Sequence, residues 1–360
     1  TCGPFTDVAA DSFCPFVQEV FYLAVTTGTN PTTFDPSASV SRLQMAAFLS
    51  RSVDRVLQRG SRRAALNQFW TAGNRTTARP INLDVTTTGP TLLQSDGADV
   101  WVANNVTGTV SRVRASDSRV LETWTGATGA YGVLAAGGFI YVTGYTSPGK
   151  LYEIDPMKPP GAVFTYATPL GNLPLQIAFD GATIFTANFG GSVSLFNKNN
   201  FAGGTVTTGF TSPYGIVYDG SNMWVTEVTI GRLQKLDSLA AILQTVTVGS
   251  QPRFPVFDGS NIWVPNFGSN SISIVRASSG VVLATLTGNG LNGPVSGAFD
   301  GQRVLITNFS GDSVSLWKAA DLTTIANVAL DAGSHPNGAC SDGLNFWLAL
   351  YGNLGQIARF

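Results

Sequence analysis

The sequence predicts a mainly β protein, a seven-bladed β-propeller preceded by a small α-helical segment. A turn motif recurs seven times from residue 90 onward, as Asp-Gly in six copies and as Ala136-Gly137 in one. A proline lies six residues before the Asp, except that Ala130 takes its place in the second copy. An aromatic residue lies five residues after the Asp, except that Leu305 takes its place in the sixth copy. Successive anchors are 40, 44, 39, 39, 42 and 42 residues apart. A fixed period near 40 with short strands is typical of a radial array of small sheets.

One copy of the repeat shows why each blade should hold four strands. Residues 214–218 alternate as a short strand, and Asp219-Gly220 supplies the hairpin turn and its positive φ. Residues 223–226, 231–236 and 242–248 follow as three further strands separated by turns. Four antiparallel strands per copy make one blade of a propeller.

The two ends of the repeat region predict how the ring closes. The last copy has strands at 337–340, 346–351 and 356–360, so it ends one strand short. Residues 80–86 resemble the fourth strands of other copies, such as residues 244–248. We therefore expect strand 80–86 to complete the seventh blade, which removes a free sheet end. The propeller then spans residues 80–360, and residues 70–79 form a linker.

The composition indicates a surface with few charges. Charged residues make up 12% of the 360, the net charge is −1, and hydrophobic residues make up 44%. Copies of such a chain repel one another little, which favours association. Two interpretations stay open: an extracellular β protein that needs little charge, or a subunit that packs against copies of itself. No apolar run approaches the roughly 20 residues of a membrane span, and the start at Thr1 without methionine suggests a removed leader.

Residues 1–69 form a separate helical segment. The apolar spacing of residues 13–25 predicts one helix, and Ser41 is placed to cap a second helix from Arg42 to about Arg59. The second helix is expected to bury a stripe of apolar residues: Leu43, Met45, Ala46, Phe48, Leu49, Val53 and Val56.

Basic residues cluster at the end of this segment. Arg51, Arg55 and Arg59 recur every four residues and so share one helix face, and Arg62 and Arg63 follow. They are either a solvated face or an interface that docks on an acidic propeller, the chain's own or a neighbour's. The density of basic residues is too low to predict nucleic-acid binding.

Three cysteines allow one disulfide. Cys2 and Cys14 flank a short polar stretch and are predicted to form it. Cys340 occupies a repeat position that elsewhere holds Ala178, Val217, Val256 and Ala298. We therefore expect Cys340 to be a buried thiol that packs as a small hydrophobe.

Groups that support catalysis are scarce. Asparagine recurs eight residues after the anchor in four copies, as a ring of ligand groups or as a turn cap: Asn104, Asn188, Asn266 and Asn308. Glu227 replaces it in the fourth copy, and His335, the one histidine, precedes the innermost strand of the seventh blade. Both are weak pocket candidates. One histidine cannot form a multi-histidine metal site, so we expect no metal, no cofactor and no enzyme activity.

Both parts of the chain resemble known families. The segments Trp101-Val-Ala-Asn104, Phe185-Thr-Ala-Asn188 and Trp263-Val-Pro-Asn266 resemble surface-layer-type Tyr-Val-Thr-Asn propeller repeats and the related virginiamycin B lyase-like propellers. The resemblance implies a propeller fold that serves as scaffold, binding platform or, in some members, enzyme. The lyases use histidine with acidic partners and a divalent metal, and this chain offers a single histidine.

The N-terminal segment resembles one S-layer homology module. The matching residues are Phe5-Thr-Asp-Val8, Phe34-Asp35-Pro36 and Ser41-Arg42-Leu43-Gln44, where Thr-Arg-Ala-Glu is usual. Such modules normally occur in threes and bind cell-wall polysaccharide. The resemblance therefore implies wall-polymer binding or, for a single module with Gln44 in place of Glu, docking between subunits.

These observations predict a secreted, non-catalytic structural protein at the cell surface that assembles with itself into a filament or surface layer. The propeller would be the building block and the N-terminal segment the connector. One alternative is a cell-surface propeller that binds a glycan or a protein. A second is a lyase-like enzyme that acts near His335 and Glu227.

Overall fold

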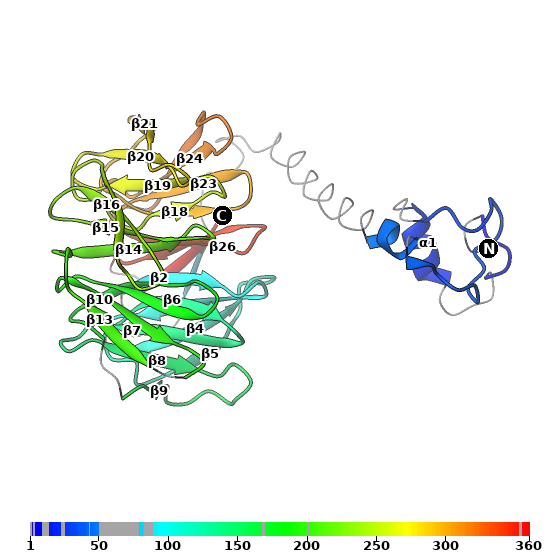
Figure 1. Cartoon of the computed structure of the whole chain (residues 1–360), viewed down its shortest axis with the longest axis horizontal. Helices are drawn as coiled ribbons and strands as arrows, with labels where there is room; N and C mark the ends of the chain where they lie inside the picture. The colour runs from blue at the N-terminus through cyan, green and yellow to red at the C-terminus, as the bar shows by residue number, and fades with distance from the viewer. Residues whose placement is uncertain are drawn as a thin grey trace. The chain divides into compact units, whose positions relative to one another are not determined.

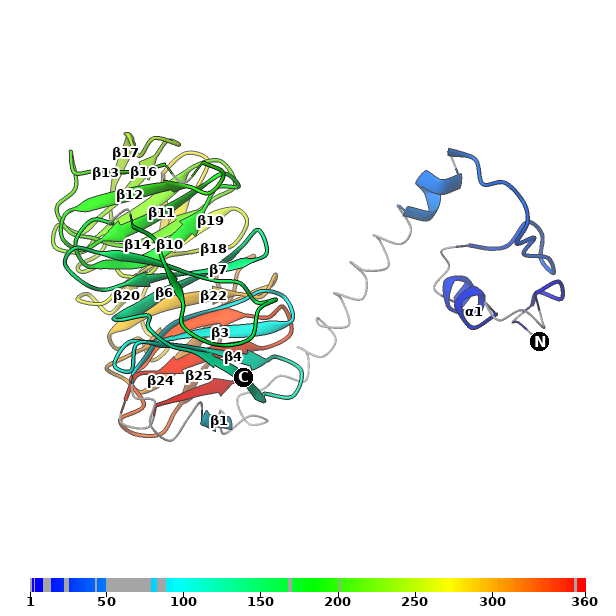
Figure 2. The same ribbon diagram turned by 90° about the horizontal axis from the view of Figure 1, so that it is seen from below.

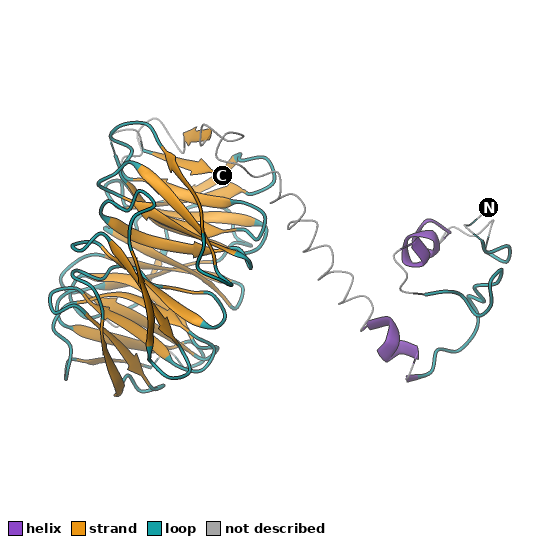
Figure 3. Cartoon of the chain, turned by 90° about the horizontal axis from the view of Figure 1, so that it is seen from above, coloured by secondary structure: helices purple, strands orange, loops and turns teal. Residues whose placement is uncertain are grey.

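The computed structural model of the chain describes residues 2, 4–8, 14–22, 26–42, 44–49, 79–82, 89–167, 170–200, 202–352 and 355–360. The chain divides into two compact units, Thr1–Asn74 and Arg75–Phe360. Helices belong to the first unit and strands dominate the second (Figure 3). Each unit is described separately below.

Within its described residues, the second unit is a ring of seven four-stranded antiparallel sheets (Figure 1). The first three blades consist of β2 (Pro90–Ser95), β3 (Asp99–Asn104), β4 (Thr109–Arg114) and β5 (Val120–Trp124); β6 (Ala130–Ala136), β7 (Phe139–Gly144), β8 (Lys150–Ile154) and β9 (Phe164–Thr165); and β10 (Pro174–Phe179), β11 (Thr183–Asn188), β12 (Ser192–Asn197) and β13 (Gly203–Val206). The next three consist of β14 (Pro213–Tyr218), β15 (Met223–Glu227), β16 (Arg232–Leu236) and β17 (Ile242–Thr247); β18 (Val256–Phe257), β19 (Asn261–Asn266), β20 (Ser271–Arg276) and β21 (Val282–Leu286); and β22 (Pro294–Phe299), β23 (Arg303–Asn308), β24 (Ser313–Lys318) and β25 (Thr324–Ala329). The seventh consists of β26 (Pro336–Ser341), β27 (Phe346–Leu350), β28 (Gln356–Arg359) and β1 (Arg79–Asn82).

The first strand of each blade is the innermost. These strands contact their neighbours in chain order around the ring, and β26 of the last blade contacts β2 of the first. Figure 2 shows this closure where the red and cyan sheets lie side by side. The seven innermost strands therefore surround the axis of the propeller.

A strand from the start of the repeat region supplies the outermost position of the last blade. β1 pairs antiparallel with β28, and Ile81 lies opposite Ile357. This strand was predicted at residues 80–86, of which residues 83–86 lie outside the described part. The ring is thus sealed by hydrogen bonds between segments far apart in the sequence.

The strands expected in the fourth copy match the structure to within one or two residues. Predicted strands at 214–218, 223–226, 231–236 and 242–248 correspond to β14, β15, β16 and β17. The agreement follows from the alternation of buried and exposed residues between strong turn signals.

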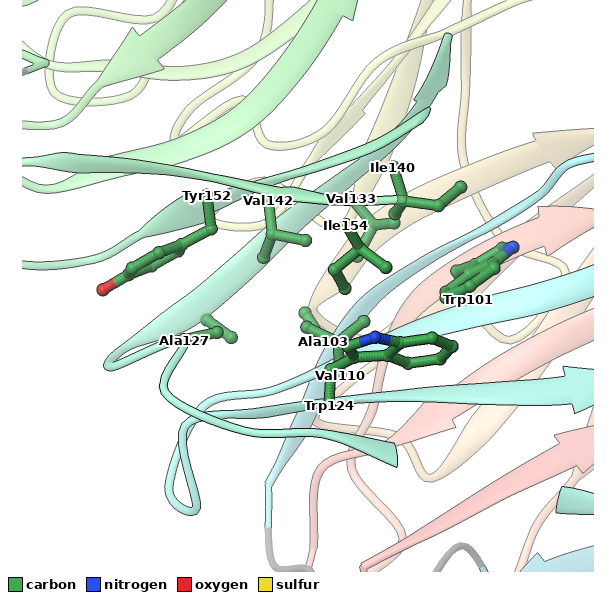
Figure 4. Packing of buried hydrophobic residues seen from close by; sticks show 11 residues of the cluster. Trp101, Ala103, Val110, Trp124, Ala127, Val133, Ile140, Val142, Tyr152 and Ile154 are labelled. Atoms are coloured by element: carbon green, nitrogen blue, oxygen red, sulfur yellow. The ribbon is translucent and has the colours of Figure 1, made fainter. Parts of the chain in front are cut away.

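The core of the propeller lies between neighbouring sheets. Figure 4 shows one such layer, in which Trp101 and Trp124 of the first blade belong to one cluster with Val142 and Tyr152 of the second. The two indole rings are 5.1 Å apart between centroids. Since each blade packs its large residues on the next blade, no blade can bury its core alone.

Each Asp-Gly turn is held by the carboxylate of its Asp. In the fourth blade, Asp219 Oδ1 accepts hydrogen bonds from the backbone N–H of Ser221 at 2.8 Å and of Asn222 at 2.6 Å. Gly220 takes φ +93°, a region that glycine enters without steric cost. The same carboxylate contacts recur in the turns that begin at Asp96, Asp180, Asp258, Asp300 and Asp342.

The N-terminal unit has a small aromatic core. Helix α1 (Cys14–Tyr22) places Phe21 against Phe5, with ring centroids 5.2 Å apart, and Phe34 lies 5.6 Å from Phe5. Residues 42 and 44–49 are also helical. The buried stripe predicted for this second helix is wrong for three of its members: Met45 is 48% exposed, Leu49 is 61% exposed and Ala46 is also exposed, because the described part of the unit does not cover them.

Candidate functional site

The carboxylate of Asp7 joins the two sequence motifs of the N-terminal unit. It accepts hydrogen bonds from the backbone N–H of Phe34 at 3.0 Å and of Asp35 at 2.7 Å. These bonds lower the pKa of Asp7 below its ordinary value. Phe5 and Val8, on either side of Asp7, are buried in the core of the unit. The Phe5–Val8 motif therefore holds the Phe34–Pro36 loop in place.

A capping box starts the second helix of this unit. The side chain of Gln44 accepts from the Ser41 backbone N–H at 2.8 Å, and the Gln44 N–H donates to Ser41 Oγ at 3.2 Å. This reciprocal pair satisfies two N–H groups that a helix start leaves open. Glutamine therefore fills the structural role of the glutamate that is usual at this position.

The predicted arginine interface lies outside the described residues. This applies to Arg51, Arg55, Arg59, Arg62 and Arg63. The interface remains a prediction of the sequence.

The disulfide between Cys2 and Cys14 remains a prediction of the sequence. The Cys2 thiol donates to the backbone carbonyl of Cys14 at 3.1 Å, so the two residues are adjacent. Cys340 is buried as expected, and burial raises the pKa of its thiol well above the ordinary value. Such a thiol packs as a hydrophobe and is a poor nucleophile.

The recurrent asparagines form buried networks with serine and threonine side chains. Asn266 Nδ2 donates to Ser271 Oγ at 3.1 Å and to Ser273 Oγ at 3.0 Å, and Asn104, Asn188 and Asn308 make the same pair of bonds. All four asparagines are fully buried. They join the second strand of a blade to its third, so they are neither exposed ligands nor caps of their own backbone.

Glu227 anchors the loop that enters its own blade. It is fully buried, and its Oε2 accepts from the backbone N–H of Thr211 at 3.0 Å and of Ser212 at 2.8 Å. Burial raises the pKa of Glu227, while these two hydrogen bonds and the charge of Arg232 oppose the rise. No described residue hydrogen-bonds to its buried Oε1.

His335 lies on a different blade from Glu227. Its ring stacks on Phe309 with centroids 4.8 Å apart, and its Nδ1 lies 3.1 Å from the Phe309 carbonyl oxygen and 3.5 Å from Asp312 Oδ1. Glu227 ends β15 in the fourth blade and His335 precedes β26 in the seventh, and these blades are not neighbours in the ring. The structure does not bring the two pocket candidates together.

Both residues nevertheless mark one end of the propeller, which we call the entry face because the innermost strands begin there. On this face one backbone hydrogen bond recurs in all seven blades. The donor is the backbone N–H of the residue that follows the second strand of a blade. The acceptor is the carbonyl oxygen of the residue that precedes the proline of the repeat, or the alanine that replaces it, at 2.7–3.2 Å. We call these donors the rim residues: Asn105, Tyr145, Phe189, Val228, Phe267, Phe309 and Tyr351. Five of the seven are aromatic.

Aromatic contacts show that side chains of this face meet on the axis. The ring of Tyr131, in the second blade, lies 6.2 Å from the ring of Phe254, in the fifth. Tyr145 is 5.6 Å from Tyr131, and Tyr214 is 4.9 Å from Phe254. Since the second and fifth blades are not neighbours, these rings can meet only across the centre of the propeller.

One cation lies within this aromatic group. The guanidinium carbon of Arg253 is 4.3 Å from the ring centroid of Tyr214 and 4.7 Å from that of Phe267. Burial raises the pKa of Tyr131 well above its ordinary value; the Tyr214 hydroxyl adds to the rise, and Asn337 and Arg253 oppose it. The entry face therefore joins aromatic rings, hydroxyl and amide groups and one guanidinium.

Sequence reasoning missed the rim residues and Arg253. The signal available was positional, since each rim residue comes nine after its anchor and Arg253 comes directly after Pro252. Among the described residues, no group of three or more His, Cys, Asp or Glu is arranged to hold a metal ion. No helix in the described ranges is long and apolar enough to cross a membrane.

Comparison with known proteins supports the division into two parts. Residues 4–46 match the S-layer homology domain. No curated protein sequence matches the chain significantly.

Solved structures match the propeller. A catalytically inactive virginiamycin B lyase from Staphylococcus aureus, crystallised with quinupristin, is 15% identical with a TM-score of 0.67, covering 79% of this chain and 98% of its own. The hydrazine synthase of Kuenenia stuttgartiensis is 17% identical with a TM-score of 0.64, covering 76% and 96%. The computationally designed protein Ika8 is 10% identical with a TM-score of 0.59, covering 79% and 99%.

At such low identities the structural neighbours establish the fold and no activity. The S-layer homology match indicates association with the cell surface. The chain thus contains an S-layer homology domain at residues 4–46 and a seven-bladed β-propeller whose structural neighbours include virginiamycin B lyase.

Proposed function

We propose that this protein is a secreted, non-catalytic building block of a cell-surface layer or filament, in which propellers pack against one another and the N-terminal unit connects or anchors them. The observation that carries the proposal is the composition of the outer edges of the blades. Glu122 is the one charged residue in the outermost strands of the first six blades, which are β5, β9, β13, β17, β21 and β25.

Uncharged edges are unusual because an outer strand presents open N–H and C=O groups to any passing strand. Natural proteins block such edges with lysine, proline or bulges. Here the register shifts next to β17 and β21 lie where those two strands begin, which leaves the rest of each ladder regular. Leu243 is 57% exposed on β17 and Leu283 is 42% exposed on β21. Both features favour pairing between copies.

The N-terminal unit supports a role as connector or anchor. Residues 4–46 match the S-layer homology domain, and such domains typically bind cell-wall polysaccharide. Phe16 is 63% exposed and Leu49 is 61% exposed, so the described unit presents apolar surface that a wall polymer or a second subunit could cover.

A non-catalytic role agrees with the two residues first considered for chemistry. Glu227 binds backbone N–H groups of its own blade, and His335 stacks on Phe309 in the neighbouring blade. Each side chain therefore has a structural role.

Electron microscopy of the purified chain tests the proposal. We expect ordered polymers or sheets from the full chain, and dispersed propellers from a variant that lacks residues 1–70. Dispersed particles of the full chain at high concentration would contradict self-assembly. Undiminished assembly of the truncated variant would contradict the connector role.

A further inference from the structure

No described residue of the propeller forms an ion pair with Arg253. Among the residues that directly follow the proline of each repeat, it alone is charged; the others are Thr91, Tyr131, Leu175, Tyr214, Val295 and Asn337. None of the ion pairs or side-chain hydrogen bonds formed by the described residues involves its guanidinium, and its buried Nε has no acceptor. A partly buried donor without an acceptor calls for a partner from outside the chain.

The position of the guanidinium is fixed by two rings. Its Cζ lies 4.3 Å from the Tyr214 centroid and 4.7 Å from the Phe267 centroid, distances at which an aromatic face attracts a cation. The rings hold the group in place and neutralise none of its charge. The side chain is partly exposed, so an anion can approach it from the entry face.

The rim around Arg253 offers stacking surfaces. Phe189 and Tyr351 are each 39% exposed, and Tyr145, Phe267 and Phe309 are partly buried. Because the same backbone hydrogen bond holds every rim residue, the rings stand on a fixed scaffold. Apolar and aromatic surface with a few convergent polar groups is typical of a ligand site.

Polar groups stand among the rings. The hydroxyls of Tyr131 and Tyr214 and the amide of Asn337 lie together near Arg253. A sugar has the matching chemistry, because the C–H face of a pyranose ring is apolar while its hydroxyls need hydrogen-bond partners. A carboxylate or phosphate on that sugar would supply the missing partner of the guanidinium.

We propose that the entry face of the propeller binds an anionic saccharide, with its carboxylate or phosphate on Arg253 and its sugar faces on the aromatic rim. This binding site is distinct from the S-layer homology domain and does not depend on self-assembly. Both anions share the chemistry that a guanidinium recognises, so the experiment uses one probe of each kind.

Isothermal titration calorimetry of the full chain tests the site. The carboxylate probe is a hexamer of galacturonic acid, with its methyl ester as the neutral control, and the phosphate probe is a 6-phosphorylated mannopentaose. We expect at least one charged probe to bind. We expect the R253Q substitution to lower the affinity for that probe by about tenfold or more. R276Q removes the same charge from an exposed position at the end of β20 and should bind like the wild type.

The second variant is F189A, which truncates an exposed rim residue and should leave the fold intact. We expect it to weaken the same probe. If neither charged probe binds, or if R253Q and F189A both bind like the wild type, the site is refuted. R253Q should leave the sedimentation of the chain unchanged, so a failure of this proposal is separable from a failure of self-assembly.

Discussion

The Asp219 carboxylate accepts a hydrogen bond from the indole N–H of Trp224 at 2.7 Å. Its other oxygen holds the turn between them, so one side chain organises both the hairpin and the core residue five positions later. The same contact joins Asp96 to Trp101, Asp258 to Trp263 and Asp342 to Trp347. The Asp-Gly-aromatic motif therefore has a structural role, which explains why it recurs from blade to blade.

We expect D219A to destabilise the propeller by about 2–4 kcal/mol, because it leaves the indole N–H of the fully buried Trp224 without an acceptor and also removes the turn contacts. Urea unfolding monitored by tryptophan fluorescence measures the change. D237A is the matched control. Asp237 also accepts two backbone N–H groups but binds no indole, so its loss should cost about 1 kcal/mol. Equal effects of the two substitutions would contradict the role of the indole contact.

The sixth blade replaces this contact with an ion pair. Leu305 stands where other blades have an aromatic residue, and Asp300 Oδ2 accepts instead from Arg303 Nε at 2.8 Å and Nη2 at 2.7 Å. Both side chains are buried. We expect R303M to destabilise the protein by about 3–5 kcal/mol, since it leaves a buried carboxylate without its counter-charge.

The double variant D300N/R303M provides the control for that pair. Asparagine keeps an oxygen for the turn and carries no charge, so we expect the double variant to be more stable than R303M in urea. A double variant as unstable as R303M would show that the arginine acts through packing alone.

Glu227 makes the stability of the propeller depend on pH. Its folded-state pKa is raised above the ordinary value of 4.5, chiefly by burial. Below pH 4.5 Glu227 is protonated in both the folded and the unfolded protein, so its burial does not lower the free energy of unfolding. As the pH rises through the folded pKa, the buried carboxyl group ionises and the free energy of unfolding falls. We expect E227Q to gain stability relative to the wild type between pH 4 and pH 7, as measured by urea unfolding. If the free energies of unfolding of E227Q and the wild type differ by the same amount at pH 4 and pH 7, Glu227 is not desolvated.

The rim depends on residues with positive φ before the innermost strands. Gly129 has φ +69°, and a methyl group added there would lie 2.9 Å from the Tyr145 carbonyl oxygen. We expect G129A to destabilise the propeller in thermal unfolding by more than G138A. Gly138 has φ +82° but no atom within 4 Å of the added methyl, so its substitution carries only the backbone cost of about 1 kcal/mol. Similar melting temperatures for the two variants would exclude the steric contact.

The sequence predicted the ring of blades because its turn chemistry is local. Asp219, Gly220 and the alternation in residues 242–248 specify a hairpin wherever they occur. The closing strand was also predictable, because the last copy lacks a fourth strand. These inferences needed only a comparison of copies with one another.

The candidate site was less predictable because it depends on contacts across the axis. Nothing local to Arg253 shows that the ring of Tyr214, from the preceding repeat, flanks it, and Tyr131 meets Phe254 only after the ring closes. Glu227 looked like an unusual site residue, and its backbone contacts became apparent only with the entering loop in place. The exposed Met45 shows a similar limit, since periodicity predicts an apolar face but not what covers it.

Sedimentation velocity of the full chain over a range of concentrations tests the central claim most directly. The account predicts species larger than the 37.8 kDa monomer that grow with concentration. The double variant L243K/L283K places charges on the outer edges of two neighbouring blades. The account predicts that this variant forms fewer of the larger species and more monomer. L344K adds a charge at a leucine that is 76% exposed in an Asp-Gly turn and should leave assembly unchanged. A wild-type chain that sediments as a monomer at every concentration would contradict the account.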